Sequence, residues 1–182
     1  MSQLKTNIII AALLVFFAAT LKVVTFPLSF NPIIAIAFFS GAVIKDRKFS
    51  FAMPLLAMFV SDVMMEVLNI APGFYGLGQI GNYLSLLMVT ILGFAMKKPS
   101  ALSIGSFSVM SSLLFFVLSN TNCFLFDNSG FYGSGMQGWL NCLAAGVPFV
   151  KNGLFTDLFF STVLFTSYYL VTVAKSRKSL AN

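Results

Sequence analysis

Long apolar runs dominate the sequence and decide what it can fold into. Six such runs, separated by short polar segments, cover most of the 182 residues. A membrane-spanning helix needs about 20 apolar residues. Only 9% of the residues are charged, whereas a soluble domain carries about 25%, and the mean hydropathy is +0.93. The sequence therefore predicts an all-α integral membrane protein and excludes a water-filled catalytic domain.

The runs predict six transmembrane helices in a single transmembrane domain, residues 1–182. The predicted spans are residues 7–26, 27–44, 49–68, 77–96, 101–120 and 149–174. The second run is short, because residues 32–44 cover only about 20 Å of a hydrocarbon core of about 30 Å. We therefore expect residues 27–31 to add an irregular outer segment. Residues 121–148 form the longest predicted outer loop, with a short interfacial helix expected at 139–147.

Basic residues mark alternate loops of this layout. Nine of the 11 basic residues lie before the first run or after the second, fourth and sixth runs. The positive-inside rule places these loops and both termini in the cytoplasm. If the second run were a re-entrant loop, Lys45, Arg47 and Lys48 would lie outside and the pattern would be lost. Lys5 is also typical of a signal peptide, but a first run of about 18 residues is long for one.

The basic residues of these loops account for the net charge of +6. The basic clusters are typical of topology signals that contact anionic headgroups of the lipid bilayer. They are short and contain no interleaved aromatic residues, which nucleic-acid binding would favour. We therefore expect no nucleic-acid partner.

Charged residues inside the spans need a reason, because each costs about 2.5 to 3.5 kcal/mol on insertion scales. Asp62 and Glu66 lie four residues apart in the third span and share a helix face. Two such carboxylates repel each other, so either one is protonated or a cation lies between them. Lys22 and Lys151 are the candidate cations. Asp157 lies nearly two turns beyond Lys151 on the last span.

Amide side chains gather in the same outer half of the predicted bundle: Asn31, Gln79, Asn82, Asn120, Asn122 and Asn152. A structural ion-pair network would explain one or two of the misplaced polar residues, and a proton path is a further alternative. A polar cavity open to the outer face explains the whole set. The residues expected to contact a ligand there are Asp62, Glu66, Asn82, Asn120, Asn152 and Asp157.

Aromatic residues of the outer loops allow two interpretations. Tyr75, Tyr132 and Trp139 form either an interfacial belt, in which such residues are enriched, or a lid over the ligand. The glycines of residues 128–135 would allow the hinge motion that a lid needs. We expect these three aromatic side chains to cover the ligand.

The two cysteines and the absence of known catalytic motifs limit the chemistry that this chain can perform. Cys123 and Cys142 either stay unlinked, form a disulfide across the predicted loop, or offer one thiolate to a metal-centred ligand. The chain has no histidine, and it contains no P-loop, Gly-x-Ser-x-Gly, His-Glu-x-x-His or Cys-x-x-Cys motif. We therefore expect that the protein is not an enzyme and has no cofactor or metal site. Of the functions considered, acid–base catalysis by the Asp62–Glu66 pair is the least favoured.

Three segments carry a resemblance to a known group of proteins. They are residues 30–42 (FNPIIAIAFFSGA), 54–62 (PLLAMFVSD) and 146–157 (GVPFVKNGLFTD). They look like a family of small bacterial membrane proteins distantly related to the S components of energy-coupling factor (ECF) vitamin transporters. The six short spans and the polar outer half resemble the S components too. The resemblance implies an ECF S-component-like bundle in the bacterial cytoplasmic (inner) membrane, which captures a vitamin and works with a separate ATPase or coupling module.

One departure from the S components concerns the partner. In S components that share a coupling module, the first helix docks through alanines four residues apart, whereas here the pairs Ala11–Ala12 and Ala18–Ala19 are seven apart. The chain would then act alone or with other membrane subunits. We expect a substrate-binding membrane subunit for uptake of a small water-soluble nutrient. The alternative is a non-catalytic structural or assembly subunit of a larger membrane complex.

Overall fold

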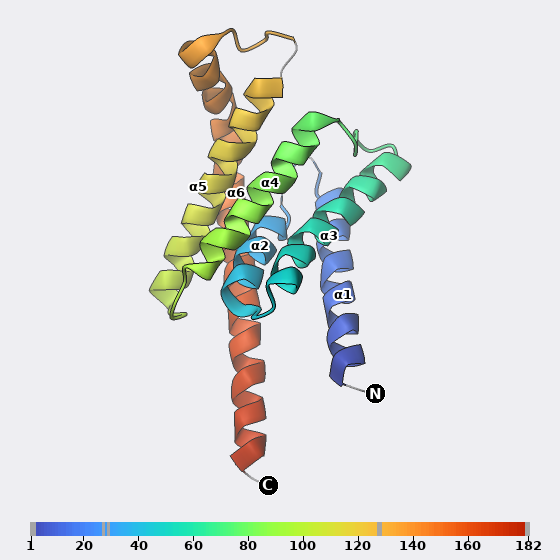
Figure 1. The fold of residues 1–182 in the computed structure, drawn as a ribbon, viewed down its shortest axis with the longest axis vertical. Coiled ribbons are helices and arrows are strands. Elements are labelled where there is room, and N and C mark those ends of the chain that lie inside the picture. Colours follow the sequence, from blue (N-terminus) through green and yellow to red (C-terminus); the bar gives the residue numbers. More distant parts are fainter. Residues whose placement is uncertain (1–2, 27, 29, 127–128, 181–182) are drawn as a thin grey trace.

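A computed structural model of the chain describes residues 3–26, 28, 30–126 and 129–180. This described part is all-helical and contains no strand. The helices are α1 (Gln3–Val24), α2 (Ile33–Val43), α3 (Arg47–Val67), α4 (Leu77–Phe94), α5 (Ala101–Phe126) and α6 (Gly135–Leu180) (Figure 1). Four of them, α3 to α6, are long and apolar enough to cross a membrane. The predicted all-α class is confirmed, and these helices are consistent with a multi-pass membrane protein.

Successive helices run in opposite directions, so the connecting segments separate into two groups (Figure 1). The connections that carry Lys45, Lys97 and Lys98 lie at the same end of the bundle as both ends of the chain, the lower end in Figure 1. We call this the basic end. The connection 68–76 and the α5–α6 connection lie at the opposite, upper end, which we call the polar end.

Helix α2 is short and central. It has 11 residues, of which seven are buried, and it packs against α3, α4, α5 and α6. At 1.5 Å per residue it is only about 16 Å long. It begins at Ile33 after an irregular segment, as its short apolar run predicted, although Pro27 and Ser29 lie outside the described residues. The centre of the bundle therefore has no helix toward the polar end.

Close contact between α2 and α4 depends on two glycines. A Cβ atom on Gly41 would collide with the backbone carbonyl of Thr90, and one on Gly93 would collide with the carbonyl of Phe38. Small residues allow two helix backbones to approach this closely. Phe38 is fully buried, and its ring centroid lies 5.2 Å from that of Phe165 on α6. The core of the bundle thus forms around α2.

Helix α1 packs against α3. Ala18 and Ala19 are both fully buried, so they serve packing within the chain and do not form an exposed docking surface. The side chains of Ala11 and Ala12 lie outside the described residues.

The predicted long outer loop is wrong. Helix α5 continues to Phe126 and α6 begins at Gly135, so most of residues 121–148 is helical, and the helix expected at 139–147 is part of α6. Pro148 lies inside α6; a proline removes one backbone hydrogen bond, but neighbouring helices make such an interruption tolerable in a membrane bundle. Of the predicted glycine-rich lid, Asn128 lies outside the described residues and 129–134 form the irregular connection.

Candidate functional site

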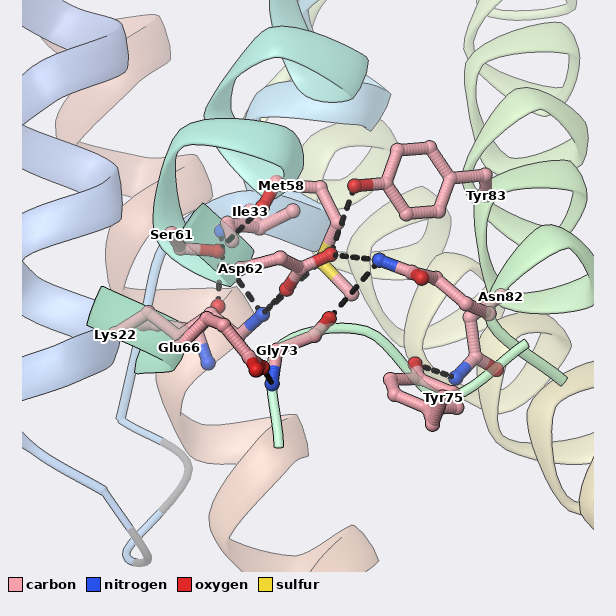
Figure 2. A network of polar contacts seen from close by, with 12 residues as sticks. Lys22, Ile33, Met58, Ser61, Asp62, Glu66, Gly73, Tyr75, Asn82 and Tyr83 are labelled. Atoms are coloured by element: carbon pink, nitrogen blue, oxygen red, sulfur yellow. Dashed lines mark hydrogen bonds and ion pairs between the residues drawn. The ribbon is translucent and has the colours of Figure 1, made fainter. Parts of the chain in front are cut away.

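A buried ion pair links α1 and α3 near the polar end. Lys22 Nζ lies 2.8 Å from Asp62 Oδ1, and the Asp62 side chain is only 4% exposed (Figure 2). Lys22 also donates to Ser61 Oγ at 3.0 Å and contacts Met58 Sδ at 3.2 Å. Lys22 is thus the cation that the sequence led us to expect beside Asp62, whereas Lys151 is exposed on α6.

Helix α4 completes the environment of the Asp62 carboxylate. Gln79 Nε2 and Tyr83 Oη donate to Asp62 Oδ2 at 2.9 and 2.7 Å. Gln79 and Tyr83 are four residues apart, so they project from one face of α4. The carboxylate therefore joins three helices, and both of its oxygens are hydrogen-bonded, which is what a buried charge requires.

Glu66 has a different role from Asp62, although the two share a helix face. It is exposed, and its Oε2 accepts a hydrogen bond from Gly73 N at 2.8 Å (Figure 2). Gly73 lies so close to α3 that a Cβ there would collide with the backbone carbonyl of Asp62. Gln79 Nε2 also donates to the Gly73 carbonyl at 3.0 Å. Glu66 thus fastens the connection 68–76 to α3.

A cavity of about 330 Å³ lies beside this network, over the first residues of α2. We call it the central cavity. Residues of α1, α2, α3, α4 and α5 and of the connection 68–76 line it. Its polar lining residues are Lys22, Asn31, Asp62, Tyr75 and Asn82. The space exists because α2 is too short to fill the centre of the bundle.

Asn82, which lines the central cavity, carries a buried oxygen that has no hydrogen-bond donor among the described residues. Its Nδ2 donates to Tyr75 Oη at 2.7 Å (Figure 2), while its Oδ1 is buried and has no hydrogen-bond partner in the described part of the chain. Partial burial raises the pKa of Tyr75 above its usual value, with the Asn82 hydrogen bond opposing this, so the phenol remains neutral. Folded proteins rarely leave a buried amide oxygen without a donor.

A second cavity, of about 240 Å³, lies between α5 and α6. We call it the Asp157 cavity. Asp157 is 2% exposed, and its Oδ2 accepts a hydrogen bond from Ser112 Oγ at 2.6 Å. Asn31, Ile34 and Phe115 line both this cavity and the central cavity, so the two spaces are neighbours.

A third cavity, of about 440 Å³, lies under the α5–α6 connection. We call it the loop cavity. Tyr75 and Asn82 line both it and the central cavity. Tyr132 and Phe131 contribute from the connection itself. The three cavities are therefore neighbours at the polar end of the bundle.

The cavities bring together six of the nine predicted ligand contacts. Asp62, Tyr75 and Asn82 line the central cavity, Asn120 and Asp157 line the Asp157 cavity, and Tyr132 lines the loop cavity. The other three, Glu66, Asn152 and Trp139, line none of them.

Asn152 and Trp139 both lie on α6, outside these three cavities. Asn152 is exposed, and its backbone carbonyl accepts from Thr156 Oγ1 at 2.8 Å. Trp139 Nε1 donates to Thr121 Oγ1 at 2.9 Å, which ties α6 to α5.

The sequence reasoning did not single out Tyr83 or Ser112. Tyr83 lies in an apolar helix, and only its spacing of four from Gln79 indicates a shared face. Ser112 is one of several serines on α5, and its spacing of four from Ser108, also buried, is the signal that indicates an inward face.

The cysteines are not joined by a disulfide in the described structure. Cys123 is exposed and lines the loop cavity. Cys142 is buried, and its thiol donates to the Asn120 carbonyl at 3.3 Å. No group of three or more Cys, Asp or Glu residues that could hold a metal ion occurs within the described ranges.

The fold and the site define a protein that is all-helical in its described part, with four helices long and apolar enough to cross a membrane and with cavities at one end whose largely apolar walls carry a few polar side chains. The chain belongs to the Family of unknown function (DUF6580), whose sequence profile matches residues 2–180. No curated protein and no solved structure matched the chain.

Proposed function

We propose that this protein is a substrate-binding membrane subunit for uptake of a small water-soluble nutrient, such as a vitamin. The solute would enter from the polar end and occupy the group of cavities around the central cavity. The non-polar walls and the few convergent polar groups are typical of small-molecule sites.

The observation that carries this proposal is the unsatisfied Oδ1 of Asn82 beside a cavity over a half-length helix. A central helix of full length would fill this space, and α2 stops short of it. A purely structural bundle has no need to keep a polar cavity and a buried acceptor without a donor, since each such acceptor costs about 1 to 3 kcal/mol.

The orientation follows from the charges. In the proposed topology all six helices cross or enter the bacterial inner membrane, with the basic end and both termini in the cytoplasm. The polar end then faces the outside, where a nutrient is captured. Energy for release would come from a separate ATPase or coupling module or from another membrane subunit.

A structural or assembly subunit is the second candidate function. Its support is the Lys22–Asp62 network, whose oxygens are satisfied within the chain and therefore need no ligand. Co-purification at fixed stoichiometry with a larger membrane complex, without a bound small molecule, would favour this candidate.

The test is ligand binding by the purified protein. Thermal-shift and native mass spectrometry screens against vitamins and nucleobases should reveal a ligand that raises the unfolding temperature. Ala71 lines the central cavity, so Ala71→Phe should fill it and reduce ligand affinity at least tenfold. Ala95 is exposed at the basic end, and Ala95→Phe is the matched control that should leave affinity unchanged.

Two results would count against the proposal. One is a screen in which no compound stabilises the protein. The other is a ligand whose affinity is the same in wild type, Ala71→Phe, Asp62→Ala and Asp157→Ala.

A further inference from the structure

Among the residues that the structure describes, no cation pairs with the Asp157 carboxylate. The described residues form one ion pair, Lys22–Asp62. It belongs to the hydrogen-bond network around Asp62 and not to the Asp157 cavity. Asp157 is as deeply buried as Asp62, yet within the described ranges its hydrogen-bond partner is Ser112 alone. Asp62 thus has a cation inside the bundle, whereas Asp157 has a single hydrogen-bond donor, and a buried carboxylate is favoured in its charged form only when a cation pairs with it.

The walls around Asp157 offer further acceptors and no basic side chain. Asn120 Nδ2 donates to the Phe116 carbonyl at 2.8 Å, which leaves its Oδ1 available as an acceptor. Ser119 adds a hydroxyl oxygen from the same helix, and Asn31 adds an amide oxygen from the segment before α2. The lining residues include no Lys or Arg, so Asp157 is the one ionisable side chain among them.

Three phenyl rings complete the Asp157 cavity. Phe115, Phe116 and Phe149 line it together with Asp157. Aromatic faces attract cations through their quadrupoles, and they do so for organic ammonium groups in particular. A site with one carboxylate, amide oxygens and phenyl rings suits an ammonium group with a short hydrocarbon or aromatic part better than a bare metal ion, which prefers several oxygen ligands.

We propose that the Asp157 cavity binds the ammonium group of a small organic cation, so that the captured nutrient is a cationic amine. This inference rests on the proposed function and adds the substrate class. Asp157 supplies the countercharge, and the rest of the molecule extends past Asn31 and Phe115 toward the central cavity.

The experiment measures affinity of the purified full chain for 2-phenylethylammonium chloride by isothermal calorimetry. The neutral compound 2-phenylethanol, which has nearly the same size and shape, is the ligand control. The wild type should bind the ammonium compound at least tenfold more tightly than the alcohol. Asp157→Asn should abolish this preference.

The matched protein control is Asp46→Asn, which makes the same carboxylate-to-amide change on an exposed residue at the basic end, where asparagine caps a helix as well as aspartate does. It should keep the preference. If Asp157→Asn fails to fold, labelling of wild-type Asp157 by dicyclohexylcarbodiimide, read by mass spectrometry, gives the answer. The ammonium compound should reduce this labelling at least fivefold, and the alcohol should not.

Equal affinity for the two compounds, or a preference that survives Asp157→Asn, would overturn the inference. So would protection of Asp157 by sodium chloride but not by the ammonium compound. If a neutral or anionic nutrient from the screen binds and loses affinity in Ala71→Phe, the proposed function stands while this inference fails. If neither the screen nor the ammonium compound gives binding, both fail.

Discussion

Lys22 and Asp62 join α1 to α3 through an ion pair of 2.8 Å inside the helical bundle. Helix α1 packs mainly against α3, so this pair lies in the principal contact that holds the first helix in place. The same carboxylate receives hydrogen bonds from α4. One side chain therefore fixes three helices around the central cavity.

Lys22→Met should destabilise the protein strongly. It leaves the buried Asp62 without its cation, and loss of one partner of a buried pair costs about 3 to 5 kcal/mol. The double variant Lys22→Met/Asp62→Asn should recover most of this loss, because no charge is then left unpaired. Chemical unfolding in detergent measures both. The single variant Asp62→Asn completes the comparison. If the losses of stability in Lys22→Met and in Asp62→Asn simply add in the double variant, the pair is not coupled.

The contact between α2 and α4 gives a second stability prediction. Gly41→Ala places a methyl group on the Thr90 carbonyl, and such overpacking costs about 1 to 3 kcal/mol. Gly105→Ala is the matched control, because a Cβ there meets no atom within 4 Å. It should stabilise α5 by about 0.5 to 1 kcal/mol. Equal unfolding temperatures for the two variants would contradict the close crossing.

Trp139 provides an optical test of the α5–α6 pairing, because it is the single tryptophan of the chain. Thr121→Val removes the acceptor of its indole N–H, so the tryptophan emission should shift and stability should fall by about 1 kcal/mol. Thr162→Val is the control, since Thr162 is exposed and bonds only to a carbonyl of its own helix. Unchanged emission in Thr121→Val would show that the indole has another environment.

The cysteines should differ in reactivity. Cys123 is exposed and Cys142 is buried, so a maleimide should label Cys123 first in detergent, and Cys142 only after unfolding. Mass spectrometry of the labelled peptides measures the order. A mass two units lower without reductant would instead reveal the disulfide that the sequence left open.

Much of the fold followed from physical regularities of the sequence. Apolar runs set the helices, with α3 and α4 within about two residues of the predicted spans, and the short second run foretold the half-length α2. The error at residues 121–148 arose because this stretch lies between two predicted spans and contains no long uninterrupted apolar run. Packing of α6 against α5 keeps that stretch helical, and such packing between distant segments is not encoded in local composition.

The candidate site was predicted in part for the same reason. Residues whose charge is out of place in a span, such as Asp62 and Asp157, are visible in the sequence. Their partners are not, because Tyr83 and Ser112 are ordinary residues for a membrane helix. Glu66 shows the converse, since its charge drew attention, yet its role depends on where a connection folds back and brings Gly73 to α3.

The proposed topology makes a prediction that decides between six spans and a re-entrant α2. In a variant with Cys123→Ser and Cys142→Ser, single cysteines would be placed at three exposed positions, Lys45, Phe74 and Ser100. If α2 completes a crossing, a membrane-impermeant maleimide added to intact cells should label only Phe74→Cys. Lys45→Cys and Ser100→Cys should react once the membrane is opened, because both lie at the basic end. Labelling of Lys45→Cys in intact cells would place the α2–α3 connection outside, and the positive-inside assignment would then be wrong.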